Sequence, residues 1–150
     1  MQGFKKRIVE SVKFHLNSKI ETLQSEYRLY MESAANETKS TAGDKHDTSK
    51  SMMQLEQEKL SGQLNQLKQM ALAVSKVDLN KVCKVGEFGS LIDTDRGKFF
   101  ISISIQGIQI DGENIQCISM QSPIGKVFMQ TKVGDLLKFQ DKEFHIKSVS

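Results

Sequence analysis

The spacing of apolar residues in the first 80 positions restricts the fold of this chain more than any other feature. Apolar or aromatic side chains recur there at steps of three and four, which keeps them on one face of a helix. The first stripe consists of Phe4, Ile8, Val12, Leu16, Ile20, Leu23, Tyr27, Tyr30 and Ala34. The second stripe consists of Met53, Leu60, Leu64, Leu67, Ala71 and Val74.

The two stripes match each other in reverse order. Five pairs have residue numbers that add to 87: Ala34 with Met53, Tyr27 with Leu60, Leu23 with Leu64, Ile20 with Leu67, and Leu16 with Ala71. This symmetry predicts an antiparallel helical hairpin, a coiled coil, that reverses between Gly43 and Asp44. Each helix of the hairpin, with roughly 30 residues, would be about 45 Å long. Tyr30 would face Gln57. The alternative is a compact bundle, for which the sequence offers no third long amphipathic helix.

The second half of the chain alternates between apolar and polar residues and is interrupted by turn signals. Six short strands are expected over 89–94, 98–105, 108–110, 114–120, 135–139 and 143–149. Turns are expected at Asp95-Arg96-Gly97, Gln106-Gly107, Asp111-Gly112 and Gly134-Asp135. Ser122 and Pro123 are typical of the start of a short helix. The sequence therefore predicts an α+β protein, with the hairpin over 1–79 and a small antiparallel β domain with one short helix over 80–150.

Composition and motifs exclude several functional classes. No apolar run is long enough to span a bilayer, and charges interrupt the apolar positions at the amino terminus, unlike in a signal peptide. The two cysteines, Cys83 and Cys117, are expected to be reduced thiols in a cytoplasmic protein, without zinc. No phosphate-binding loop or catalytic triad is present. We therefore expect no independent enzyme, no membrane partner and no small-molecule substrate. Lys5-Lys6-Arg7 is interpreted as a solvated helix end.

The predicted hairpin tip, "GDKHDT", has two interpretations. Gly43 would end the first helix, Asp44 would cap the second, and Asp47 would complete a capping box. Alternatively, two carboxylates on a first helical turn could contribute oxygen ligands to a Mg²⁺ ion held elsewhere. His46 lies between the two aspartates and Lys45 precedes it. A capping box could itself position the carboxylates, so both interpretations remain open.

At the tip and in the carboxyl-terminal segment, the sequence resembles the GreA/GreB family of bacterial transcript-cleavage factors. Gly43, Asp44 and Asp47 match the family's glycine, aspartate and, three residues later, glutamate. The segment "SPIGKVFMQTKVGDLLKF" (122–139) matches its Ser-Pro motif, glycine-containing short helix and Val-Gly-Asp turn. The resemblance implies a hairpin tip and an FKBP-like β domain.

The resemblance also implies a function. The hairpin would enter the secondary channel of RNA polymerase, where Asp44 and Asp47 would share a Mg²⁺ ion with the polymerase and promote cleavage of backtracked RNA. Gly43, Lys45 and His46 would support the tip, and the RNA 3′ end would be reached indirectly. The β domain would dock at the channel mouth, with polymerase-binding candidates at Ser122, Pro123, Ile124 and Gly125. The chain alone would need no cofactor.

Departures from the family pattern favour two alternatives. Asp47 stands where the family has glutamate, "TSKSMM" replaces the usual Asn-Ala-Glu-Tyr, and the amino terminus lacks the usual opening. A family member that occupies the channel without promoting cleavage would tolerate such changes. An alternative from a different class is a coiled-coil adaptor whose hairpin binds helices of another protein.

Overall fold

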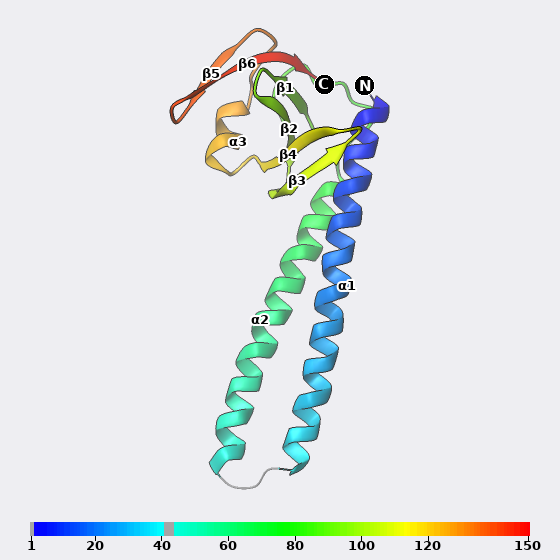
Figure 1. Cartoon of the computed structure of the whole chain (residues 1–150), viewed down its shortest axis with the longest axis vertical. Helices are drawn as coiled ribbons and strands as arrows, with labels where there is room; N and C mark the ends of the chain where they lie inside the picture. Colours follow the sequence, from blue (N-terminus) through cyan, green and yellow to red (C-terminus); the bar gives the residue numbers. More distant parts are fainter. Residues whose placement is uncertain (1, 41–43) are drawn as a thin grey trace. The chain divides into compact units, whose positions relative to one another are not determined.

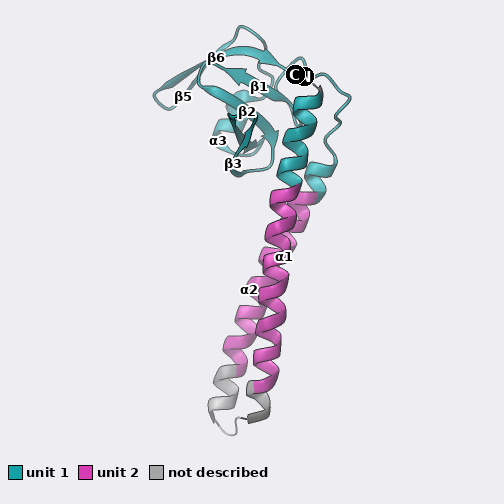
Figure 2. Ribbon diagram, turned by 45° about the vertical axis from the view of Figure 1, so that its right-hand side comes forward, with its two compact units in different colours: residues 1–13, 72–150 teal, residues 14–71 magenta. Residues whose placement is uncertain are grey.

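The computed structural model describes the backbone of residues 2–40 and 44–150 and the side chains of residues 3–36 and 50–150. The chain forms two compact units. One unit contains residues 1–13 and 72–150, and the other contains residues 14–71 (Figure 2). We refer to them as the β unit and the arm. The predicted boundary between residues 79 and 80 stays a prediction.

Two long helices form the arm. Helix α1 spans Gln2–Ser40 and helix α2 spans Asp44–Ser75. Within the arm they run side by side in opposite directions (Figure 1), as the matched stripes predict. Every stripe residue of the arm is buried or half-buried. The sequence places Tyr30 opposite Gln57. In the structure the amide Nε2 of Gln57 donates a hydrogen bond to the hydroxyl of Tyr27, over 3.1 Å.

The β unit contains a mixed six-stranded sheet. Its strands are β1 (Leu91–Thr94), β2 (Gly97–Ser102), β3 (Ile105–Ile110), β4 (Glu113–Ser119), β5 (Leu136–Phe139) and β6 (Lys142–Val149). Their order across the sheet is β3-β4-β2-β1-β6-β5. All neighbouring pairs are antiparallel except β2 and β4, which are parallel. The expectation of a purely antiparallel sheet is therefore wrong at this pair.

The parallel pair arises because the predicted strand 98–105 is divided in two. Strand β2 ends at Ser102, and β3 begins at Ile105 and runs along the edge of the sheet. Strand β4 then returns between them and pairs with both. The predicted turn at Gln106-Gly107 is also wrong, because these residues lie inside β3, where the register shifts between Ile105 and Ile108. A bulge absorbs the glycine there without reversing the chain.

Other local predictions are confirmed. Asp111 and Gly112 have φ angles of 53° and 77° and join β3 to β4, as a tight hairpin with two left-handed residues requires. Gly97, with φ of 114°, ends the turn between β1 and β2. Helix α3 spans Pro123–Phe128, with the predicted serine cap and a proline in its first turn.

The core of the sheet is built around three phenylalanines. Phe99 and Phe128 have ring centroids 4.8 Å apart, and Phe144 lies 5.7 and 5.5 Å from them. Phe128 comes from α3, so this trio holds the short helix against the sheet. The surrounding buried residues are Ile92, Ile101, Ile118 and Ile146. The overall class is α+β as predicted, whereas the FKBP-like assignment stays a prediction.

Candidate functional site

The chain reverses between α1 and α2. Helix α1 ends at Ser40 and α2 begins at Asp44, so Asp47 belongs to the first turn of α2. Gly43 and the side chains of Asp44, Lys45, His46 and Asp47 lie outside the described residues. The capping and Mg²⁺-binding interpretations of the tip therefore both stay predictions. Among the described residues, no group of three His, Cys, Asp or Glu side chains could hold a metal ion.

The predicted polymerase-binding residues lie at the start of α3, where Ser122 is engaged within the chain. Its hydroxyl donates to the carbonyl oxygen of Ser119, over 2.7 Å, and accepts from the backbone N–H of Gly125, over 3.0 Å. Its own backbone N–H also donates to Ser119. Ser122 is therefore a helix cap that ties α3 to the end of β4.

Gly125 has a steric role at the same place. It is buried, and a Cβ atom there would lie 1.8 Å from the carbonyl oxygen of Ser119. Only glycine permits this close approach of helix and strand. Ile124 is half-buried against the core, which leaves Pro123 as the exposed member of the four. Three of the four predicted binding residues thus have roles inside the fold, and none of these roles tests polymerase binding.

The Val-Gly-Asp segment is also explained by local folding. The carboxylate of Asp135 accepts a hydrogen bond from the backbone N–H of Lys132, over 2.8 Å, and another from the hydroxyl of Thr131, over 3.2 Å. Gly134 has a φ of 91°, which favours glycine. Val133 and Leu136 flank this turn with 62% and 50% of their surfaces exposed. Together with Pro123 they are the exposed apolar residues of the family-like segment 122–139.

A buried lysine in the β unit was not anticipated from the sequence. Lys5 is only 4% exposed, and its ammonium group lies 3.9 Å from the sulfur of Cys83. Burial lowers the pKa of Lys5, although Cys83, Glu87 and Asp78 act in the opposite direction. The interpretation of this position as a solvated helix end is wrong. Lys5 precedes Val9 by four residues and Val12 by seven, which places it on their face of the helix.

Charged groups surround this contact. Burial raises the pKa of the Cys83 thiol, and a hydrogen bond with Glu87 raises it further. Lys81 lies 2.7 Å from a carboxylate oxygen of Glu87, and its hydrogen bond lowers the pKa of that carboxyl. A thiol whose pKa is raised is protonated at neutral pH and a poor nucleophile. The cluster is therefore suited to holding the chain together and unsuited to covalent chemistry.

The start of α1 also contacts the sheet through Phe4 and Arg7. Arg7 pairs with Asp111, with 2.5 Å between nitrogen and oxygen, and Lys98 lies over the ring of Phe4, 4.9 Å from its centroid. Lys98 also pairs with Glu113. Exposed pairs of this kind contribute little stability individually. Arg7, like Lys5, thus has a partner within the β unit.

Comparisons with known proteins leave the family open. No family model matches the sequence, and no curated protein sequence matches it. Among solved structures, that of the transcription factor Gfh1 is similar with a TM-score of 0.36 and 14% sequence identity, over 91% of this chain and 92% of that chain. We rest no conclusion on a similarity at this level. Within the described residues, no helix is long and apolar enough to cross a membrane.

Proposed function

We propose that this protein regulates RNA polymerase through its secondary channel and promotes cleavage of backtracked RNA with the acids at the hairpin tip. The observation that carries the proposal is the position of Asp44 and Asp47 on the first turn of α2, directly after the chain reversal. The portion of α1 from residue 14 to its end at Ser40 is about 40 Å long. A thin two-helix arm of this length suits a narrow channel, and its tip carries the only carboxylates that the family resemblance makes functional.

The tip carboxylates would act only inside the polymerase. There Asp44 and Asp47 would accept hydrogen bonds from a water molecule and hold it in line with the scissile phosphodiester bond. The Mg²⁺ ion would be shared with the polymerase and would supply Lewis-acid stabilisation of the attacking and leaving oxygens. The start of α2 favours nearby negative charge through the helix dipole, so acids suit this position. Two aspartates alone do not form a catalytic site, so the protein would act by completing that of its partner.

The β unit would dock outside the channel. Exposed Pro123, Val133 and Leu136 supply apolar surface for this contact. Ser122, Ile124 and Gly125 would contribute indirectly, by holding α3 in place. We therefore assign the proposed docking contact to Pro123 and the Val133 turn more than to the whole Ser122–Gly125 motif.

The proposal is tested on a stalled, backtracked elongation complex of the cognate polymerase with Mg²⁺. We expect the protein to accelerate RNA shortening and the double variant Asp44→Asn/Asp47→Asn to lose most of this acceleration. Asparagine still caps a helix, so the variant removes charge while retaining the fold. Lys59→Gln, which changes an exposed residue in the same helix, is a control that should retain activity. Equal shortening with the protein and the double variant would contradict a role for the acids.

A second candidate function, occupation of the channel without promotion of cleavage, has support from one residue. Asp47 is one methylene shorter than the glutamate of the family pattern, so its carboxylate reaches less far toward a shared ion. A protein that occupies the channel without promoting cleavage would compete with a known channel-binding factor, and the double variant would compete equally well. Acceleration of RNA shortening by the wild-type protein would exclude this candidate.

A further inference from the structure

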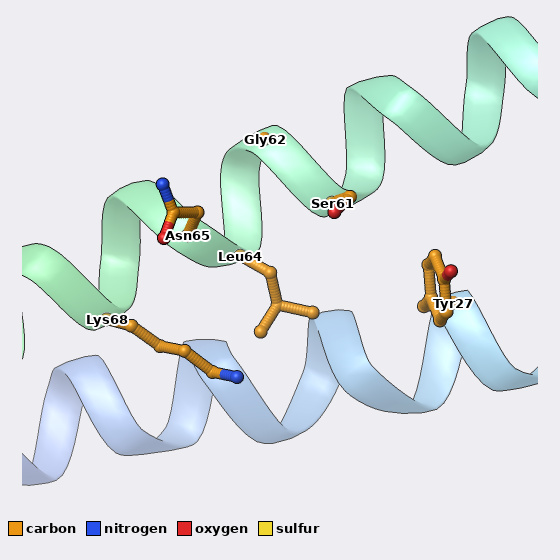
Figure 3. Close-up of a pocket in the computed structure, with 6 residues that line it drawn as sticks. All are labelled: Tyr27, Ser61, Gly62, Leu64, Asn65 and Lys68. Carbon is orange, nitrogen blue, oxygen red and sulfur yellow. The ribbon is translucent and has the colours of Figure 1, made fainter.

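A continuous groove runs along one side of the arm between α1 and α2. Its first section is a hollow of about 520 Å³ lined by Tyr27, Ser61, Gly62, Leu64, Asn65 and Lys68 (Figure 3). Tyr27 points from α1 toward α2, and Lys68 reaches from α2 toward α1. A second hollow shares Tyr27 and Leu64 with the first. A third shares Met31 with the second and continues toward Met53.

The apolar residues that line this groove, which we call its floor, are incompletely covered. Tyr27, Met31, Ala34, Met53 and Leu64 form this floor, and all but Leu64 remain at least partly exposed. Polar residues such as Ser61, Asn65 and Gln57 line the groove as well. Two helices alone cannot enclose a shared apolar stripe, because each helix covers only one side of the other. A third helix laid in the groove would cover the floor, as in a three-helix coiled coil.

The rim of the groove is positively charged. Arg28, Lys50 and Lys68 line it, and none of the lining residues is a carboxylate. The described part of the arm nevertheless has its own acids, at Glu21, Glu26, Glu32, Glu56 and Glu58. Within that part of the chain, no ion pair joins these acids to the three rim cations. The cations are therefore available to an acidic ligand.

Gly62 lines the first hollow of the groove. It lies in the middle of α2, where glycine costs about 1 kcal/mol relative to alanine. Packing does not require it, because a Cβ atom there would meet no described atom within 4 Å. Gly62 therefore leaves open space beside the first hollow.

We propose that this groove binds an amphipathic helix of another protein, with an apolar inner face and acidic flanks. A second copy placed by a two-fold axis would bring the rim cations against the same cations, which disfavours a symmetric dimer here. A nucleic acid strand would satisfy the cations but would leave the methionine and leucine floor against phosphate and sugar. This inference concerns the side of the arm and does not depend on the proposed role of the tip.

The test measures binding of the full chain to designed helical peptides by fluorescence anisotropy. The probe is a labelled peptide of about four heptads with leucine at the core positions and glutamate at the flanking positions. The same peptide with lysine in place of glutamate is the first comparison, and a labelled single-stranded RNA is the second. We expect the acidic peptide to bind, with affinity that falls as salt is raised, and the basic peptide to bind at least about tenfold more weakly.

Matched variants distinguish peptide binding in the groove from binding elsewhere on the arm. Arg28→Glu/Lys68→Glu reverses two rim charges and should weaken acidic-peptide binding at least about tenfold. Lys13→Glu/Lys59→Glu makes the same charge change on the same two helices, at exposed positions that line neither this groove nor the hollow beside Leu23 and Leu67, and should change binding less than about twofold. Circular dichroism verifies that both variants retain the helices. No binding of the acidic peptide, equal effects of the two double variants, or preferential binding of RNA would overturn the proposal.

Discussion

The arm and the β unit bury their apolar residues to very different extents. Phe128 in the β unit is fully buried within a trio of aromatic rings, whereas Leu23 in the arm is only half-buried. The difference follows from the number of neighbouring elements, because a sheet with a helix on it encloses a core and a pair of helices does not. The β unit thus fixes its residues by internal contacts, while the arm retains partly exposed apolar surface.

The largest predicted effect tests this contrast directly. Phe128→Ala should lower the free energy of unfolding of the β unit by about 3–5 kcal/mol, because it empties the centre of the aromatic trio. Leu23→Ala should lower that of the arm by only about 1–2 kcal/mol, because its side chain is already partly hydrated in the native state. Amide hydrogen exchange under native conditions would measure both values separately.

Tyrosine fluorescence provides a second readout of the same comparison. The chain has two tyrosines, Tyr27 and Tyr30, and both belong to the arm. Leu23→Ala should lower the urea concentration at the midpoint of this signal by a modest amount. Equal losses for Leu23→Ala and Phe128→Ala would show that the arm is as tightly packed as the β unit, and the contrast would be wrong.

The same difference explains which parts of the fold could be predicted from the sequence. A helical stripe repeats its signal many times, so the antiparallel pairing of the two helices followed from spacing alone. In the structure Tyr27 and Leu64 line one hollow, and Ala34 and Met53 line another. Period-two alternation identifies a strand but does not determine which strand pairs with it. The insertion of β4 between β2 and β3 was therefore missed, as was the bulge at Gly107.

The candidate site could be predicted only in part, for two physical reasons. The motif Ser122–Gly125 was recognisable, but its residues proved to be needed for folding as well, and sequence alone does not separate the two roles. Lys5 was missed because a lysine is ordinarily solvated, even though its spacing from Val9 places it on the buried face. The groove between α1 and α2 was not visible as a site, because Arg28 and Lys68 are far apart in the sequence.

An intermediate effect is predicted for the buried Lys5. Burial lowers the pKa of Lys5 in the folded protein. At pH values between that lowered pKa and the ordinary value of 10.5, the unfolded chain therefore binds more protons than the folded protein does. Through this linkage, protonation of Lys5 opposes folding below its folded-state pKa, and the penalty is relieved as the pH rises toward 10.5. Lys5→Met should therefore be more stable than the parent at neutral pH, by about 1 kcal/mol.

The pH dependence of the Lys5→Met effect distinguishes burial of charge from simple repacking. The gain should shrink as the pH is raised, and chemical denaturation at a series of pH values measures it. The raised pKa values of Cys83 and Cys117 act in the opposite sense at alkaline pH, so the quantity to follow is the difference between variant and parent. Lys6→Met, at an exposed neighbouring position, is the matched control. A gain that is constant with pH would indicate that methionine only packs better.

The smallest predicted effect concerns Gly62 in the arm, and Gly125 in the β unit provides the contrast. Gly62→Ala should raise the stability of the arm by about 0.5–1 kcal/mol, because a methyl group there meets no described atom and alanine favours the helix. The equivalent change at Gly125 should destabilise the β unit, because its Cβ atom would overlap the Ser119 carbonyl oxygen. Thermal unfolding of the two variants gives opposite shifts if the arm is loosely packed and the β unit is not. A loss of stability for Gly62→Ala would mean that the groove beside it is filled within the free chain, which would remove the room for a partner helix.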